Sequence, residues 1–309
     1  MLVFAAFLVF LGYGFDRFYI GDGELVFPFG TLTALGIGSV SSLTSYYSGD
    51  RAVLLATGAI PIDRALSGAG SDDDGLKLRQ LDNVVEEMSI AAGLPKPKVF
   101  VVPDTDPNAF ATGRDPEHAS IAVTRGLLDA VTRDELQGVV AHELSHVRNL
   151  DIRLMTVIAA MVGTIALLSD WAGRGLRSSP RAGSDRRDGG KDKSGAAVFL
   201  LVIWLVAIVL APVVGQMLAM LVSRRREYLA DASGAELTRN PLALASALEK
   251  IEHAHLPTLS VKRGSAHLCI ADPLGRVIGL RQGVVADLLA SHPPMSNRVT
   301  ALRQMAFQQ

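Results

Sequence analysis

The chain has 309 residues and a mass of 32.8 kDa, and its 30 lysines and arginines nearly balance 31 aspartates and glutamates. A mean hydropathy of +0.29 with 20% charged residues excludes a disordered chain and is high for a purely soluble protein. The net charge of −1 argues against nucleic acid as a main partner. The single cysteine, Cys269, excludes an internal disulfide and a zinc site built from several cysteines, so any metal ligands must be histidines and carboxylates.

Two apolar segments open the chain. Leu2–Phe15 is nearly all apolar but shorter than the roughly 20 residues of a membrane span. It lacks the basic start and the small-residue cleavage site of a secretory signal, so we interpret it as a first membrane helix, completed by Gly14–Tyr19 or by residues upstream. Leu25–Tyr46 contains no charged residue and is long enough to span a bilayer. We therefore expect a transmembrane hairpin over residues 1–47.

Residues 48–153 have the charge density of a soluble domain. Apolar residues at helical spacing predict a helix over Gly75–Ala92. Runs of β-branched and aromatic residues predict strands over Pro97–Val102 and Ser120–Val123. A second helix is predicted over Thr132–Asn149, which opens with the Thr-x-x-Glu pattern of a capping box. These elements would form the first part of a globular domain.

A second apolar pair follows. Leu154–Leu168 and Ala196–Val222 have lengths that favour membrane spans over the alternative, buried helices of a soluble core. Between them, Gly173–Gly195 is rich in Gly, Ser, Arg and Asp, which predicts a flexible loop rather than a polyanion-binding patch. We expect a second transmembrane hairpin over residues 154–222, and the second part of the globular domain over residues 223–309.

His142 and His146 stand four residues apart on the predicted helix, so both imidazoles project from one face and can reach one metal ion. Zinc accepts neutral imidazole nitrogens in tetrahedral sites. Glu143, directly after the first histidine, would lie beside the activated water and accept its proton. The pattern therefore predicts a hydrolytic zinc site, although these ligand types admit other divalent ions. The alternative is a pair of surface histidines on an ordinary helix.

Two histidines leave a catalytic zinc ion one protein ligand short. The extended pattern with a third histidine is excluded, because Asn149 and Ile152 occupy its Gly and His positions. Glu227 would complete the set from another helix. Asp231, one turn later, could hold a ligand imidazole through its other nitrogen. The alternative is that Glu227 belongs to an interfacial charge cluster with Arg224–Arg226.

Four motifs carry a family likeness. They are His142–His146 (HELSH), Glu227–Asp231 (EYLAD), Pro107–Gly113 (PNAFATG) and Ser291–Arg298 (SHPPMSNR). Together they resemble the HtpX family of membrane-bound zinc metalloproteases, which are relatives of the CAAX prenyl proteases. The likeness extends from about Leu25 to Leu302.

The resemblance assigns roles to these residues. It implies one zinc ion held by His142, His146 and Glu227, with Glu143 as the general base. It also implies that the Asn108–Gly113 segment is an edge strand, to which an extended substrate adds through backbone hydrogen bonds. The alternative for this segment is an ordinary loop. The substrate-binding residues would be Asn108, Ala109, Phe110 and Ala111.

The oxyanion of a tetrahedral intermediate needs a hydrogen-bond donor besides the metal. His292 and Arg298 are the candidate donors in the C-terminal motif. The alternatives are that His292 belongs to a packed His-Pro-Pro turn and that Arg298 is a surface cation.

Membrane topology follows from the site. His146 and Glu227 must reach the same ion, so the chain crosses the membrane an even number of times between them. Basic residues are nearly balanced between the two sides, so the positive-inside rule does not decide the orientation. The resemblance implies a multi-pass protein of the cell (inner) membrane with a cytoplasmic site.

The expected fold is a mainly α-helical integral membrane protein, with about four transmembrane helices and a zincin-like metalloprotease domain that carries a small β-sheet. The expected function is a zinc endopeptidase with protein or peptide substrates. The resemblance implies quality control of misfolded membrane proteins. The alternatives are a CAAX-type processing protease and a non-catalytic membrane scaffold, in which Glu143 would be dispensable.

Overall fold

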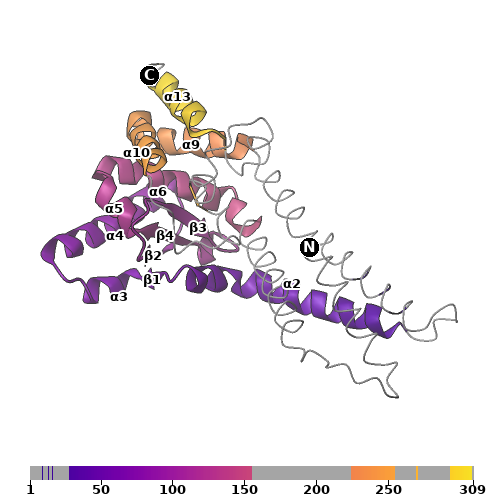
Figure 1. Ribbon diagram of the computed structural model, residues 1–309. Helices are drawn as coiled ribbons and strands as arrows, with labels where there is room; N and C mark the ends of the chain where they lie inside the picture. Colours follow the sequence, from indigo (N-terminus) through magenta and orange to yellow (C-terminus); the bar gives the residue numbers. More distant parts are fainter. Residues whose placement is uncertain are drawn as a thin grey trace, which may run out of the picture. The chain divides into compact units, whose positions relative to one another are not determined.

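The computed structural model describes Val9, Tyr13, Asp16 and residues 28–154, 224–254, 269–270 and 293–307 (Figure 1). By internal contacts the chain divides into two compact units, one of residues 1–47 and 161–214 and one of residues 48–160 and 215–309. Nearly all of Leu2–Phe15, and almost the whole predicted second hairpin with its loop, lie outside the described residues. The four predicted domain segments stay predictions.

The described chain begins with α2, Phe29–Ala56, a helix of 28 residues. Its first turn is capped by Asp16, whose carboxylate accepts hydrogen bonds from the backbone N–H groups of Gly30, at 2.6 Å, and Thr31, at 2.8 Å. A carboxylate is favourable there because the first N–H groups of a helix lack intrahelical acceptors. Within the described ranges, no helix combines the length and the apolar character that a bilayer crossing requires.

A four-stranded sheet organises the second unit, with strand order β1-β2-β4-β3. β2 and β4 are parallel, whereas β1 and β3 each pair antiparallel with their neighbour. The two strands predicted from composition are confirmed as β2 and β4. The predicted edge strand is also confirmed, because β3 lies at one end of the sheet, and the alternative of an ordinary loop is wrong. The strands are β1 Ile60–Pro61, β2 Lys98–Val102, β3 Ala109–Thr112 and β4 Ser120–Thr124.

Helices accompany this sheet in the described part of the unit. The two helices predicted around residues 75–92 and 132–149 are confirmed as α4 and α6, and α6 begins with the predicted capping box. The helices are α3 Ile62–Ser67, α4 Asp72–Ala92, the 3₁₀ turn η1 Pro116–His118, α5 Arg125–Ala130, α6 Arg133–Arg148, α9 Arg224–Thr238, α10 Pro241–His253 and α13 Met295–Ala306.

The α6 helix lies at the centre of this unit. Figure 1 shows it between the sheet and the helices α9 and α10, and it packs on α4, α9, α10 and β3. Its apolar stripe is fully buried in the main core, and this burial holds a helix that carries several charged residues inside the fold. The stripe consists of Leu136, Val139, Val140, Leu144 and Val147. Glycine allows the close approach of α9, since a Cβ at Gly234 would lie 3.2 Å from the backbone nitrogen of His142.

Candidate metal centre

Helices α6 and α9 bring three donor groups together. His142 and His146 project from one face of α6, and Glu227 comes from the first turn of α9. The two Nε2 atoms are 3.2 Å apart, and the Glu227 carboxylate oxygens lie 3.8 Å from His142 Nε2 and 3.7 Å from His146 Nε2. Both His142 and Glu227 are buried, so the alternatives of a surface histidine pair and an interfacial charge cluster are wrong.

This donor set fits zinc. Two donors bound to one tetrahedral zinc ion at its usual bond lengths lie about 3.3–3.6 Å apart. With one oxygen of Glu227 as the ligand, the three donor atoms all lie within 4.8 Å of one another, so side-chain adjustments would bring them to the spacing of a zinc site. Two imidazoles and one carboxylate also match a catalytic zinc site, which keeps its fourth position for water or substrate. The three residues predicted from the sequence thus form a group able to hold a metal ion.

His142 is oriented by a buried ion pair. Its Nδ1 lies 3.0 Å from Asp231 Oδ1. Arg298 donates to both oxygens of that carboxylate, from Nε at 2.8 Å and from Nη2 at 2.7 Å. Burial alone would raise the pKa of Asp231, but the Arg298 charge and hydrogen bonds outweigh burial and lower it to about 2. Asp231 is therefore a carboxylate that leaves Nε2 of His142 facing the metal position.

His146 has a similar arrangement that the sequence analysis missed. Its Nδ1 lies 3.1 Å from Asp151 Oδ2, and Arg226 Nη1 donates to Asp151 Oδ1 at 2.6 Å. Burial lowers the pKa of His146, but the hydrogen bond to Asp151 and the charge of Glu227 outweigh burial and raise it to about 9. The cluster of carboxylates thus favours a positive charge here, which a bound cation would supply.

Glu143 lies between α6 and the sheet. Its carboxylate is buried and accepts a hydrogen bond from the backbone N–H of Ala111 on β3. Burial raises the pKa of Glu143, although the neighbouring charges of His142 and His146 oppose that shift. A carboxyl group with a raised pKa next to a metal position is suited to taking up and returning a proton near neutral pH.

Comparison with known proteins places this geometry in a family. The model for peptidase family M48 matches residues 76–306. "Protease HtpX homolog" of Caldanaerobacter subterraneus subsp. tengcongensis is 43% identical over 85% of this chain and 80% of its own length. The chain belongs to peptidase family M48, among the HtpX proteases. A second protein of that description, from Tropheryma whipplei, is 40% identical over 93% of this chain and 88% of its own.

The fold of this M48 peptidase also has a solved relative. The crystal structure of S. mikatae Ste24p is similar with a TM-score of 0.52 and 18% identity. The match covers 97% of this chain and 63% of that one, so this chain spans less than two thirds of the Ste24p length. As a member of the family, the protein is a zinc metalloprotease, which confirms the predicted reaction class and cofactor.

Arg298 of the M48 peptidase lies inside the site and not on the surface. It is fully buried, so the alternative of a surface cation is wrong. Besides Asp231, its Nη1 reaches the Ile270 carbonyl at 3.2 Å and Glu227 Oε2 at 3.3 Å. These contacts already engage the guanidinium. Its role as an oxyanion donor stays a prediction. His292, the other predicted donor, lies outside the described residues.

The predicted substrate strand is buried and partly hydrogen-bonded on its outer side. The backbone N–H of Ala109 donates to the side chain of Asn108 at 3.0 Å, and its carbonyl accepts from Ile270 N at 2.9 Å. Phe110 packs with Cys269 in a small second core. These contacts anchor the first half of β3. The Ala111 N–H, by contrast, faces Glu143.

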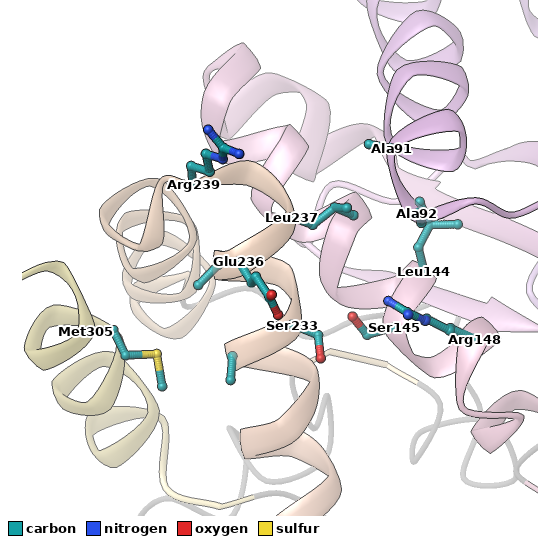
Figure 2. A pocket seen from close by; sticks show the side chains of 12 residues that line it. Ala91, Ala92, Leu144, Ser145, Arg148, Ser233, Glu236, Leu237, Arg239 and Met305 are labelled. Atoms are coloured by element: carbon teal, nitrogen blue, oxygen red, sulfur yellow. The ribbon is translucent and has the colours of Figure 1, made fainter. Parts of the chain in front are cut away.

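A separate cavity of about 950 Å³ lies on another face of the M48 peptidase's central helix. Figure 2 shows Ser145 and Arg148 of α6 opposite Ser233 and Glu236 of α9. Because successive helix residues are rotated by about 100°, these α6 side chains project away from the metal-binding face. The side chains of His142, His146 and Glu227 do not line this cavity.

Proposed function

We propose that this M48 peptidase is a membrane-embedded zinc endopeptidase whose ion is held by His142, His146 and Glu227 and whose general base is Glu143. The observation that carries the proposal is the placement of Glu143, buried beside the three donors and hydrogen-bonded to the edge strand. A scaffold protein would have no use for a buried carboxylate with a raised pKa at this position, which favours the enzyme over the scaffold alternative.

Glu143 would act twice in the reaction. It takes a proton from the attacking water and then returns that proton to the amine that leaves. When bound, zinc lowers the pKa of water and polarises the scissile carbonyl. Asp231 and Arg298 keep the ring of His142 fixed during these steps, because both are buried and Arg298 donates to both oxygens of Asp231.

The substrate backbone is proposed to pair with β3. The backbone groups of Ala109 are already hydrogen-bonded within the protein, and the Ala111 N–H donates to Glu143, so the substrate would pair from the Ala111 carbonyl onward while Asn108, Ala109 and Phe110 shape the strand. A peptide lying along Ala111 comes next to the Glu143 carboxylate, because the Ala111 N–H donates to it. Strand addition selects extended backbone more than side-chain identity, which suits loops and unfolded segments of many proteins.

The cellular setting is a further part of the proposal. The apolar segments of the sequence support a multi-pass protein of the inner membrane, with the site on the cytoplasmic side and misfolded membrane proteins as substrates. A CAAX-type processing protease is the competing function. A preference for prenylated peptides over unfolded proteins would favour that alternative.

The test is casein cleavage by detergent-purified, zinc-loaded protein and its Glu143→Gln variant, with bound zinc counted in both. We expect both to hold one zinc ion, and the variant to lose at least 1,000-fold in rate, since it lacks the proton acceptor. Glu117→Gln, on the exposed turn η1, is the matched control and should cleave like the wild type. Cleavage by Glu143→Gln at the wild-type rate would overturn the assignment of the base.

A further inference from the structure

We propose that Asp151 and Arg226 are positioning residues for the metal site: Asp151 fixes the ring of His146, and Arg226 ties Asp151 to the helix that carries Glu227. The proposal rests on the ligand set of the proposed function. Both oxygens of Asp151 are engaged, Oδ2 with His146 Nδ1 at 3.1 Å and Oδ1 with Arg226 Nη1 at 2.6 Å. Asp151 is 7% exposed and the Arg226 side chain is 43% exposed, so the carboxylate is buried while the arginine lies at the edge of the site.

His146 needs such a partner more than His142 does. The His146 side chain is 16% exposed, against 1% for His142, so packing restrains its ring less. A carboxylate on Nδ1 holds the proton on that nitrogen and leaves the lone pair of Nε2 for the ion. Without Asp151 the ring could rotate or take the other tautomer, and the ion would lose a preoriented donor.

Arg226 connects the two helices that supply the ligands. It directly precedes Glu227 on α9 and reaches back to Asp151, which follows the end of α6. An arginine that donates to a partly buried carboxylate makes a charge-assisted hydrogen bond, which is stronger than a neutral one. The pair therefore sets the start of α9, and with it the carboxylate of Glu227, against the end of α6.

The backbone before Asp151 is built for this placement. Leu150 has a φ of 60°, in the left-handed region that is unfavourable for a non-glycine residue. Its side chain is 43% exposed, so burial of that side chain contributes little to offset the cost. The left-handed residue turns the chain back after α6, and the next side chain, Asp151, reaches His146. Unfavourable backbone conformations are commonly retained where function requires them.

The other histidine shows the same construction. Asp231 holds His142 and is held by Arg298, as Asp151 holds His146 and is held by Arg226. Each metal-binding imidazole thus has one carboxylate on Nδ1, and each carboxylate has one arginine. The repetition favours a metal-orienting role for Asp151 and Arg226 over an incidental surface ion pair.

The test measures zinc affinity in the full detergent-purified chain by competition with a chromophoric chelator, together with the melting temperature of the metal-free protein. Removing a carboxylate that orients a metal ligand typically costs 10–100-fold in metal affinity. We expect that loss for Asp151→Asn, a smaller loss for Arg226→Gln, and near wild-type affinity for Arg226→Lys. Asp129→Asn, at an exposed ion pair with Lys77, is the matched control and should bind zinc like the wild type.

The outcomes separate this inference from the proposed function. Wild-type zinc affinity in a folded Asp151→Asn chain would overturn the positioning role while leaving the ligand set intact. If Arg226→Lys lowered both the melting temperature of the metal-free protein and the zinc affinity, the pair would be purely structural. That result would also overturn the positioning role. A wild-type chain that binds no zinc would overturn both proposals. The zinc affinity is measured without any cleavage. Loss of casein cleavage in the first test therefore does not decide whether Asp151 and Arg226 position the metal site.

Discussion

Gly234 controls how closely α9 approaches His142, the first of the proposed metal ligands. A Cβ at this position would lie 3.2 Å from the backbone nitrogen of His142 and 3.4 Å from its Cα. Those contacts are with backbone, which cannot swing aside as a flexible side chain can. A larger residue would therefore move α9, and Glu227 with it, away from α6.

We predict that Gly234→Ala lowers zinc affinity several-fold, because the third donor shifts relative to the two imidazoles. Its melting temperature should not rise, although alanine favours a helix by about 1 kcal/mol over glycine. Gly75→Ala in α4, where an added Cβ meets nothing within 4 Å, is the matched control and should keep zinc affinity and gain slightly in stability. Unchanged affinity in Gly234→Ala would contradict the close-packing account.

Single residues of the site differ in how far the sequence could predict them. His142, His146 and Glu143 follow from helical spacing, which is a local property. Asp151 does not, because its contact with His146 depends on the left-handed Leu150, for which the sequence offers no glycine or asparagine as a signal. Arg298 was predicted in the site as a candidate donor, but its clamp on Asp231 joins residues 67 positions apart and needed the fold.

Among the elements, α6 is tied to α10 by a charged cluster at its first turn. Glu135, the last residue of the capping box, accepts hydrogen bonds from Ser246 at 2.6 Å and from Lys250 at 2.7 Å. Burial raises the pKa of Glu135, but these hydrogen bonds outweigh burial and hold the pKa below its ordinary value of 4.5. The carboxylate form therefore stabilises the folded state.

This shift predicts acid sensitivity. The unfolded chain binds a proton at Glu135 more readily than the folded chain does, so the stabilisation is complete above pH 4.5 and is lost as pH falls through the lower folded pKa. We expect Glu135→Gln to lower the melting temperature by a few degrees at pH 7 and to show a smaller further drop below pH 4.5. Glu87→Gln, at the exposed pair with Arg133, should change it less. Parallel curves of melting temperature against pH for wild type and Glu135→Gln would refute the stabilising role of the Glu135 carboxylate.

Elements with strong local patterns were predictable, and the order of the strands was not. The strands β2 and β4 and the helices α4 and α6 carry clear periodicity or capping residues, and the structure confirms them. The two-residue β1 has too few residues for any period. The composition of β3 favours a loop, and the family likeness indicated a strand. Composition fails here because the strand is stabilised by pairing with β4 and by core packing of Phe110.

At the scale of the whole molecule, the metal site constrains how the chain crosses a membrane. His146 and Glu227 lie within reach of one ion, so the residues between them must begin and end on one side. The sequence predicts two spans there, Leu154–Leu168 and Ala196–Val222, which would place Gly173–Gly195 on the opposite side. Charge bias does not set the direction, so accessibility has to be measured.

The chain is well suited to single-cysteine labelling, because its only cysteine, Cys269, is 1% exposed. We predict that Glu117→Cys and Arg187→Cys react with a membrane-impermeant maleimide from opposite faces of sealed inner-membrane vesicles, since one predicted span, Leu154–Leu168, separates residue 117 from residue 187. The unsubstituted chain is the background control, and labelling after detergent should reach both positions. Reaction of both cysteines from the same face would mean that residues 154–222 do not cross the membrane. That result would leave the metal site intact and remove the second hairpin.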